Sequence, residues 1–290
     1  MMAIITYRPE LSPEEKQLSM AKYYDLPLYA PAPLQQQLLD AGPIDPKLAL
    51  KPEHWLDLLK PRGYNPVEYG YCMLEDGSGY IAMYSVYPNN CEPKMLAWWF
   101  HWLNVPPKSQ PLGPTGLDNI KYKIWCPPDH IGHGFVNGKD KWGGIWTVES
   151  LDLGQGEEKV YTIRHPINLK EYGLTDEKEK ELKDAGCWVD SAYETFHSVD
   201  QQHTPLPGTH LMLTLSRPCP LGGMEKITRE WIGYGLKDGR VWRDHSTPAD
   251  MLCEAYLKKV MIHATVEAQQ LSKFLPELYR EYKDKPDDAD

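Results

Sequence analysis

Residues 247–282 read TPADMLCEAYLKKVMIHATVEAQQLSKFLPELYREY. Thr247 as N-cap, Pro248 in the first turn and Asp250 near the positive end of the helix dipole predict a helix from about Pro248 to about Tyr282. Residues three or four apart form one stripe at helical period. The stripe consists of Leu252, Tyr256, Val260, His263, Glu267, Leu271, Phe274 and Leu278. A stripe of this length predicts a helix that packs on a core.

The centre of this stripe carries two residues that a core normally excludes, His263 and Glu267. A buried carboxylate or imidazole is costly unless it is paired or binds a metal. In one interpretation, Glu267 accepts a hydrogen bond from His263 and both are satisfied inside the fold. In the other, the H-x-x-x-E spacing places a nitrogen and an oxygen ligand of a divalent ion on one helix face.

The rest of the chain from Tyr64 onward predicts mostly strands. Tyr69–Leu74 and Tyr80–Tyr87 flank the hairpin signal EDGSG (75–79), and an aromatic helix is expected at Glu92–Leu103. A charged surface helix is expected at Thr175–Ala185. Further strands are predicted at Lys121–Cys126, Gly144–Leu151, Lys159–His165, His210–Ser216, Glu225–Leu236 and Val241–Trp242. This order predicts an α+β fold in which a curved antiparallel sheet wraps around the C-terminal helix.

The first 62 residues differ in composition from the rest of the chain. They are rich in proline and contain only short helical segments, near Pro33–Asp40 and Pro52–Leu59. Helices of this length are marginal alone. We therefore expect residues 1–62 to form a small dimerisation arm and residues 63–290 to form the main domain.

Composition excludes several classes of function. The net charge of −10 and the absence of a basic patch argue against a nucleic-acid partner. Six cysteines without a C-x-x-C pair and an N-terminus without an apolar run indicate a cytoplasmic protein with reduced thiols, and no membrane role is expected. The 10 Trp and 18 Tyr, against 4 Phe, favour a pocket for a phenolic or other aromatic ligand.

Partners for His263 and Glu267 are expected on strands or loops that face the helix. Two segments qualify, WCPPDHIGH (125–133) and WGGIWTVES (142–150). Strand alternation in the second places Ile145, Thr147 and Glu149 on one face. The alternatives are that Glu149 is an outward strand carboxylate and that His130 and His133 are surface loop residues.

Several blocks together resemble the 2,4-diacetylphloroglucinol hydrolase and phloretin hydrolase family. The blocks are GYCMLEDGSGY (70–80), WWFHW (98–102), YKIWCPPDH (122–130), WGGIWTVES (142–150), RHP (164–166), GGMEKITREWIGY (222–234) and HATVEAQQLSKFLPELY (263–279). The resemblance implies zinc-dependent cleavage of the carbon–carbon bond between an acyl group and a phenolic ring. It also implies a small N-terminal dimerising domain, a homodimer, and a helix-grip domain like that of the birch pollen allergen.

The same resemblance implies a set of site residues. Zinc is expected on His130, Glu149, His263 and Glu267, with Glu157 or Glu158 as substitutes for Glu149. Tyr122 and Tyr234 correspond to tyrosines that orient the substrate phenol. His133 stands where the diacetylphloroglucinol enzyme has an asparagine, and it is a candidate for moving a proton.

Two other functions are compatible with such a chain. A non-catalytic helix-grip carrier of hydrophobic aromatic ligands would hold the His263 and Glu267 pair without a metal. A metal-dependent phenol oxygenase normally uses two His and one carboxylate with open positions, which a second carboxylate fits poorly. A serine hydrolase is not expected, because the chain has no G-x-S-x-G elbow.

Overall fold

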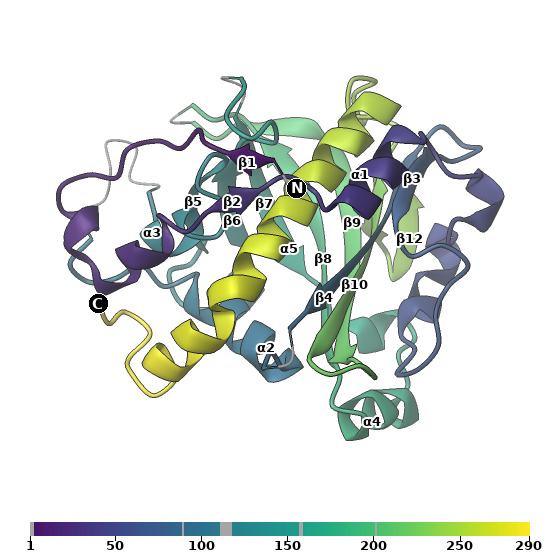
Figure 1. Cartoon of the computed structure of the whole chain (residues 1–290). Helices are drawn as coiled ribbons and strands as arrows, with labels where there is room; N and C mark the ends of the chain where they lie inside the picture. The colour runs from purple at the N-terminus through teal and green to yellow at the C-terminus, as the bar shows by residue number, and fades with distance from the viewer. Residues whose placement is uncertain (1–2, 89, 111–117, 157–158, 201) are drawn as a thin grey trace.

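The structure is a computed structural model, and it describes residues 3–88, 90–110, 118–156, 159–200 and 202–290. Its centre is an eight-stranded antiparallel sheet that α5 (Glu254–Tyr282) crosses on one face (Figure 1). In spatial order the strands are β3 (Gly70–Met73), β4 (Gly79–Tyr87), β10 (Met224–Ile232), β9 (Pro205–Pro218), β8 (Trp188–His197), β7 (Val160–Pro166), β6 (Ile145–Glu149) and β5 (His130–Phe135). The predicted α+β class is confirmed.

Smaller elements surround this sheet. The other α-helices are α1 (Pro33–Asp40), α2 (Pro93–Trp102), α3 (Ile120–Lys123) and α4 (Asp176–Asp184). Two short strand pairs are β1 (Ile4–Ile5) with β2 (Leu28–Tyr29), and β11 (Tyr234–Lys237) with β12 (Arg240–Arg243). The 3-10 helices are η1 (Glu15–Gln17), η2 (Ser19–Tyr23), η3 (Pro46–Leu48), η4 (Pro52–Leu58), η5 (Lys141–Gly143) and η6 (Leu169–Tyr172).

Side-chain alternation divides the sheet into an apolar face and a polar one. On β9, Leu211, Leu213 and Leu215 join a buried cluster with Trp55 and Leu182. The intervening residues His210, Met212 and Thr214 line a cavity on the opposite face. The cavity therefore lies between the sheet and α5.

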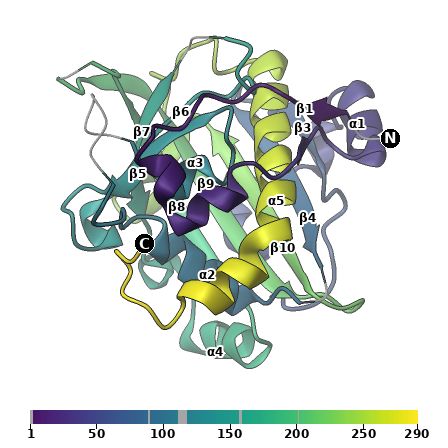
Figure 2. The ribbon, with the colours of Figure 1, turned by 60° about the vertical axis from the view of Figure 1, so that its left-hand side comes forward.

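The C-terminal half of α5 packs on an aromatic cluster shared with α2 and the N-terminal segment (Figure 2). The rings of Trp99 and Phe274 lie 5.9 Å apart between centroids, and those of Tyr23 and Phe274 lie 5.1 Å apart. These contacts fix the position of α5 over the sheet, and they involve residues of the N-terminal arm. The division of the chain at residue 62 stays a prediction.

Several predicted elements differ from the observed ones. The helix α5 begins at Glu254 rather than near Pro248, because residues from Pro248 to Leu252 form turns in which Pro248 O and Ala249 O accept bonds from Met251 N and Leu252 N. The predicted strand Lys121–Cys126 is instead the short helix α3, because the Asn119 side chain caps it by accepting from Lys121 N at 3.0 Å.

Other differences concern the strands. The predicted strand Glu225–Leu236 is split by Gly233, whose φ of 89° ends β10 and starts β11. A side chain at position 233 would also meet Arg243, since a Cβ there lies 2.6 Å from its Nη1. Strand β8 was not predicted, and the segment from His130 to Phe135 is a strand rather than a loop.

Within the described ranges, no helix combines the length and apolar character needed to cross a membrane.

Candidate functional site

Two adjacent strands bring a second histidine and a second carboxylate to the α5 pair. In the antiparallel pairing of β5 with β6, His130 lies directly opposite Glu149, and His133 lies opposite Thr147. Directly paired residues on one face have neighbouring side chains. Of the two alternatives for Glu149, the structure has the inward one, because Glu149 and Thr147 both line the cavity under α5.

Four side chains from three elements converge at the cavity wall. His130 Nε2 lies 3.5 Å from an oxygen of Glu149 and 3.5 Å from an oxygen of Glu267. His263 Nε2 lies 3.7 Å from each of the same two oxygens. The two Nε2 atoms are 3.4 Å apart. All four predicted zinc ligands therefore meet at one point.

Hydrogen bonds on the far side of each imidazole fix which nitrogen faces this point. His130 Nδ1 lies 3.1 Å from the backbone carbonyl of Tyr122, which can only accept, so Nδ1 carries the proton. His263 Nδ1 lies 2.6 Å from a carboxylate oxygen of Asp129. Both Nε2 atoms are thus left to face each other, and two lone pairs at this separation need a positive charge between them.

Asp129 was not predicted from the sequence. It is buried, and its other oxygen accepts bonds from Ser150 Oγ at 2.8 Å and from Gly154 N at 3.1 Å. A carboxylate so anchored orients the His263 ring, as carboxylates behind metal-bound histidines do. The only sequence signal was its position immediately before His130, in a loop rich in proline.

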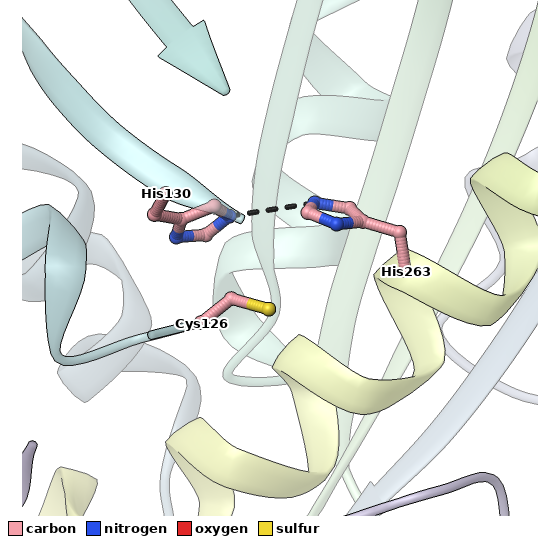
Figure 3. A group of neighbouring side chains, drawn as sticks. All are labelled: Cys126, His130 and His263. Atoms are coloured by element: carbon pink, nitrogen blue, oxygen red, sulfur yellow. Dashed lines mark hydrogen bonds between the residues drawn. The ribbon is translucent and has the colours of Figure 1, made fainter. Parts of the chain in front are cut away.

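A third donor, the Cys126 thiol, lies beside the two histidines. Figure 3 shows the His130 and His263 rings facing each other, with the Cys126 sulfur pointing toward the space below them. One ligand atom of each lies within 4.8 Å of the others, so this buried group is able to hold a metal ion. Burial raises the pKa of the Cys126 thiol well above its usual range, which disfavours the thiolate.

The electrostatics of the four converging residues depend on the balance between burial and neighbouring charge. Burial raises the pKa of Glu149. Burial alone would lower the pKa of His263, but the bond to Asp129 and the charges of Glu149 and Glu267 raise it to about 9. Burial opposes ionisation of Glu267 as well, but its neighbours His130 and His263 lower the pKa of that carboxyl. Without a metal, a proton on His263 supplies the positive charge that the carboxylates require.

The distances also fit a divalent metal. The five separations that involve a histidine nitrogen are 3.4–3.7 Å, and a regular tetrahedron with such edges has its centre about 2.1–2.3 Å from each corner, close to the usual zinc–nitrogen and zinc–oxygen lengths of roughly 2.0–2.2 Å. Two imidazoles and two carboxylates are also donors that zinc accepts. The four converging residues therefore fit a zinc ion.

Tyr122 and His133 both lie in the cavity, as predicted. The Tyr122 hydroxyl donates to Glu149 Oε2, and its ring stacks on His130 with 3.7 Å between centroids. His133 Nδ1 lies 2.9 Å from Thr147 Oγ1. Burial, together with the charges of Arg164 and His130, lowers the pKa of His133 well below its usual value, so its imidazole is neutral.

Tyr234 is not brought to this cavity. Its hydroxyl lies 2.5 Å from Asp76 Oδ2, and the Arg243 guanidinium lies over its ring at 5.8 Å. The turn at Gly233 carries Tyr234 out of β10 into the separate β11–β12 pair, away from the cavity lining. The substitutes considered for Glu149, Glu157 and Glu158, lie outside the described residues.

The sheet floor opposite the four converging residues carries a group of charged side chains that sequence reasoning missed. Arg164 and Glu194 are register partners across β7 and β8, and Glu194 and His210 are partners across β8 and β9. His210 Nε2 lies 3.0 Å from Glu230 as an ion pair rather than an aligned hydrogen bond. Arg164 also pairs with Asp190 at 2.7 Å. All five line the cavity.

The chain matches a known protein family over most of its length. The family model described as "DAPG hydrolase PhiG domain" matches residues 50–280. The chain belongs to this family. The family predicted from the sequence is therefore confirmed, and so is the prediction that the chain is a hydrolase.

Individual relatives are distant. A phloretin hydrolase from Eubacterium ramulus is 33% identical over 118 residues, which cover 40% of this chain and 38% of that protein. A 2,4-diacetylphloroglucinol hydrolase from a Pseudomonas species is 24% identical over 287 residues, covering 90% of this chain and 87% of the relative. The corresponding enzyme of Pseudomonas protegens is also 24% identical and is covered over 84% of its length.

The His210 environment predicts a pH-dependent contribution to stability. Burial alone would lower the pKa of His210, but Glu230 and Glu194 raise it to about 10, against about 6.5 in an unfolded chain. The stabilisation of the folded state by protonated His210 is therefore complete below about pH 6.5, and it is lost as the pH rises toward 10. The loss of unfolding free energy caused by His210→Gln should shrink over this range in urea titrations.

The same substitution at exposed His54 serves as a control and should change stability by less than about 0.5 kcal/mol at each pH. A cost of His210→Gln that stays constant from pH 6.5 to 10 would contradict the assignment.

Proposed function

We propose that this chain is a zinc-dependent hydrolase that cleaves the carbon–carbon bond between an acyl group and a polyhydroxylated phenol ring. The substrate is an acylphloroglucinol or a phloretin-like ketone, and the products are a carboxylic acid and a phenol. The observation that carries this proposal is the convergence of two imidazole Nε2 atoms and two carboxylate oxygens at one buried point. Membership in the family supports the reaction type.

The proposed metal ligands are His130, Glu149, His263 and Glu267. When bound, zinc lowers the pKa of a water molecule and polarises a carbonyl oxygen. Asp129 and the Tyr122 carbonyl hold the two imidazoles with Nε2 directed inward. Cys126 is left as a buried neighbour, because its thiol resists ionisation.

The chemistry requires a proton at the ring carbon and an oxygen at the acyl carbon. Protonation of the ring carbon that bears the acyl group makes the bond that breaks part of a β-dicarbonyl system. Water then adds to the side-chain carbonyl, and the ring leaves as a phenol. Water thus supplies both the oxygen of the acid and the hydrogen of the ring, and no oxidant is consumed.

The described side chains have separate tasks in this reaction. His133 is neutral, and with Nδ1 directed at Thr147 its Nε2 is left to transfer a proton. The Tyr122 hydroxyl, held at Glu149, positions a ring hydroxyl. The charged floor formed by Glu194, His210 and Glu230 offers partners for the remaining hydroxyls. We also propose that the architecture is of the helix-grip type, supported by the long helix lying over the antiparallel sheet.

The metal assignment predicts about one zinc per chain in the purified protein. Glu267→Gln and Glu149→Gln should each lose zinc on dialysis. In each variant a neutral amide replaces one of the two negatively charged ligands. Asp129→Asn should weaken zinc binding by about 10–100-fold. Elemental analysis measures the content of each variant.

Cys126→Ser is the matched control and should keep its zinc. If Cys126→Ser loses zinc and both glutamate variants retain it, the metal is bound by Cys126, His130 and His263 instead. Full retention in Glu267→Gln alone would make His263 and Glu267 a hydrogen-bonded pair.

The reaction predicts a requirement for hydroxyls ortho or para to the ketone, because only these stabilise the protonated ring. Methylating the ortho hydroxyls of an acylphloroglucinol should suppress turnover. Tyr122→Phe should lower turnover at least about tenfold (1.4 kcal/mol) while zinc content is unchanged. Tyr234→Phe is the control and should act like the wild type, because Tyr234 lies outside the cavity.

Isotope labelling separates the rival functions. In ¹⁸O-labelled water, the label should appear in the carboxylic acid and not in the phenol. Label arriving from dioxygen would instead identify an oxygenase. Binding of acylphenols by the zinc-loaded protein without any turnover would identify a carrier.

We further propose a homodimer formed through residues 1–62. Large apolar side chains are unusually exposed in this segment, including Ile4 at 59% and Tyr7 at 53%. Leu34 at 67% and Leu38 at 43% lie one turn apart on the same face of α1. Such a face is costly in water and is typical of a protein contact.

Light scattering should give twice the 33.3 kDa chain mass for the wild type. The double variant Leu34→Glu, Leu38→Glu should be a folded monomer, whereas Val86→Glu, at a site 53% exposed outside the segment, should remain a dimer. A monomeric wild type would contradict the proposal.

A further inference from the structure

An apolar groove lies on the surface beside the N-terminal end of α5. Its outer walls are formed by Leu206 and Pro207 of β9, by Pro248 and Met251 before the helix, and by Ala255 in its first turn. Leu206 is 48% exposed, although it is a large apolar residue. Exposed apolar surface of this kind is typical of a ligand-binding groove.

The groove adjoins the cavity that is lined by three of the proposed zinc ligands, Glu149, His263 and Glu267. Leu151, Val160, Phe196 and Tyr256 line both spaces, and among the described residues they form their common boundary. Three of these four side chains are purely apolar. A molecule in the cavity that extends toward the groove would therefore pass mainly apolar side chains.

Helix geometry sets the distance between the proposed metal ligands and the groove. Val260 and Tyr256 lie successively one turn nearer the start of α5 than His263, and both line the cavity. Seven residues of α-helix span roughly 10 Å. An acetyl group has one carbon beyond its carbonyl and would not reach the groove.

The polar side of the cavity is the sheet floor, whereas the side next to the groove is apolar. The sheet floor carries Arg164, Glu194, His210 and Glu230, which suit a ring with several hydroxyls and would be left unpaired by a hydrocarbon chain. The side next to the groove, at Val260 and Phe196, suits a hydrocarbon chain and would leave ring hydroxyls without hydrogen-bond partners. The two ends of an acylphenol therefore match the two sides in only one orientation.

We propose that the groove is the acyl-tail subsite of this enzyme, and that its substrates are phenolic ketones with an apolar alkanoyl tail several carbons long. This inference rests on the proposed function. The ring lies over the charged floor, the ketone lies at the four proposed zinc ligands, and the tail passes Tyr256 into the groove. The subsite selects for chain length, because each buried methylene lowers the free energy of the bound state.

A series of acylphloroglucinols with acetyl, butanoyl, hexanoyl and octanoyl groups tests the subsite in the zinc-loaded, full-length protein. The value of kcat/KM should rise at least about tenfold from acetyl to hexanoyl. The corresponding acid products should inhibit competitively in the same order, which measures tail binding without relying on turnover.

Ala255→Trp should narrow the groove without altering the cavity, since Ala255 is exposed and lines only the groove. It should remove most of the preference for hexanoyl and octanoyl, for turnover and for acid inhibition, and leave acetyl turnover within about twofold. Glu177→Trp, at an exposed position on α4, is the control and should retain the preference.

The possible outcomes separate the two levels of the proposal. Turnover of the acetyl compound without a gain from longer tails, or a preference that Ala255→Trp leaves intact, overturns the subsite and leaves the hydrolase function standing. Failure to turn over any member of the series by the zinc-loaded wild type overturns the proposed function itself.

Discussion

The cavity depends on one electrostatic constraint, the approach of two imidazole nitrogens to 3.4 Å with their protons directed elsewhere. Asp129 and the Tyr122 carbonyl hold the opposite nitrogens, so His130 Nε2 and His263 Nε2 face each other. Two carboxylates stand beside them at 3.5–3.7 Å. This arrangement of donors without an intrinsic cation is stable only with a proton or a metal ion at its centre.

The scaffold supplies this constraint from three rigid elements. A single turn of α5 separates His263 from Glu267, and the direct pairing of β5 with β6 sets His130 against Glu149. The aromatic packing around Phe274 fixes the helix over the sheet. Because the four residues lie on a helix and on strands, their separations are set by backbone geometry, so the site is organised without a bound metal.

The part of the site that lies on one element was predictable from the sequence, and the part that requires tertiary pairing was not. The helical period alone marked His263 and Glu267 as buried residues in need of partners. His130 and Glu149 gave only ambiguous local signals, and the family resemblance was needed to select them. Asp129 was missed because its importance comes from its contact with His263, 134 residues away in the chain.

Several failures of pattern-based prediction have identifiable structural causes. Strand β8 was overlooked because its cavity face carries Asp190 and Glu194, where an ordinary sheet would carry apolar residues. Tyr234 was expected to orient the substrate phenol because the family resemblance implied it, whereas the positive φ of Gly233 turns the chain away from the cavity. Charged residues on a cavity face, and glycine turns that redirect a strand, both break the periodicity on which sequence interpretation depends.

X-ray absorption at the zinc edge of the purified, zinc-loaded protein tests the central claim most directly, because it reports which atoms surround the metal. Coordination by two imidazoles and two carboxylates predicts a first shell of nitrogen and oxygen alone, at about 2.0–2.2 Å. A sulfur scatterer at about 2.3 Å would place Cys126 in the shell and contradict the account.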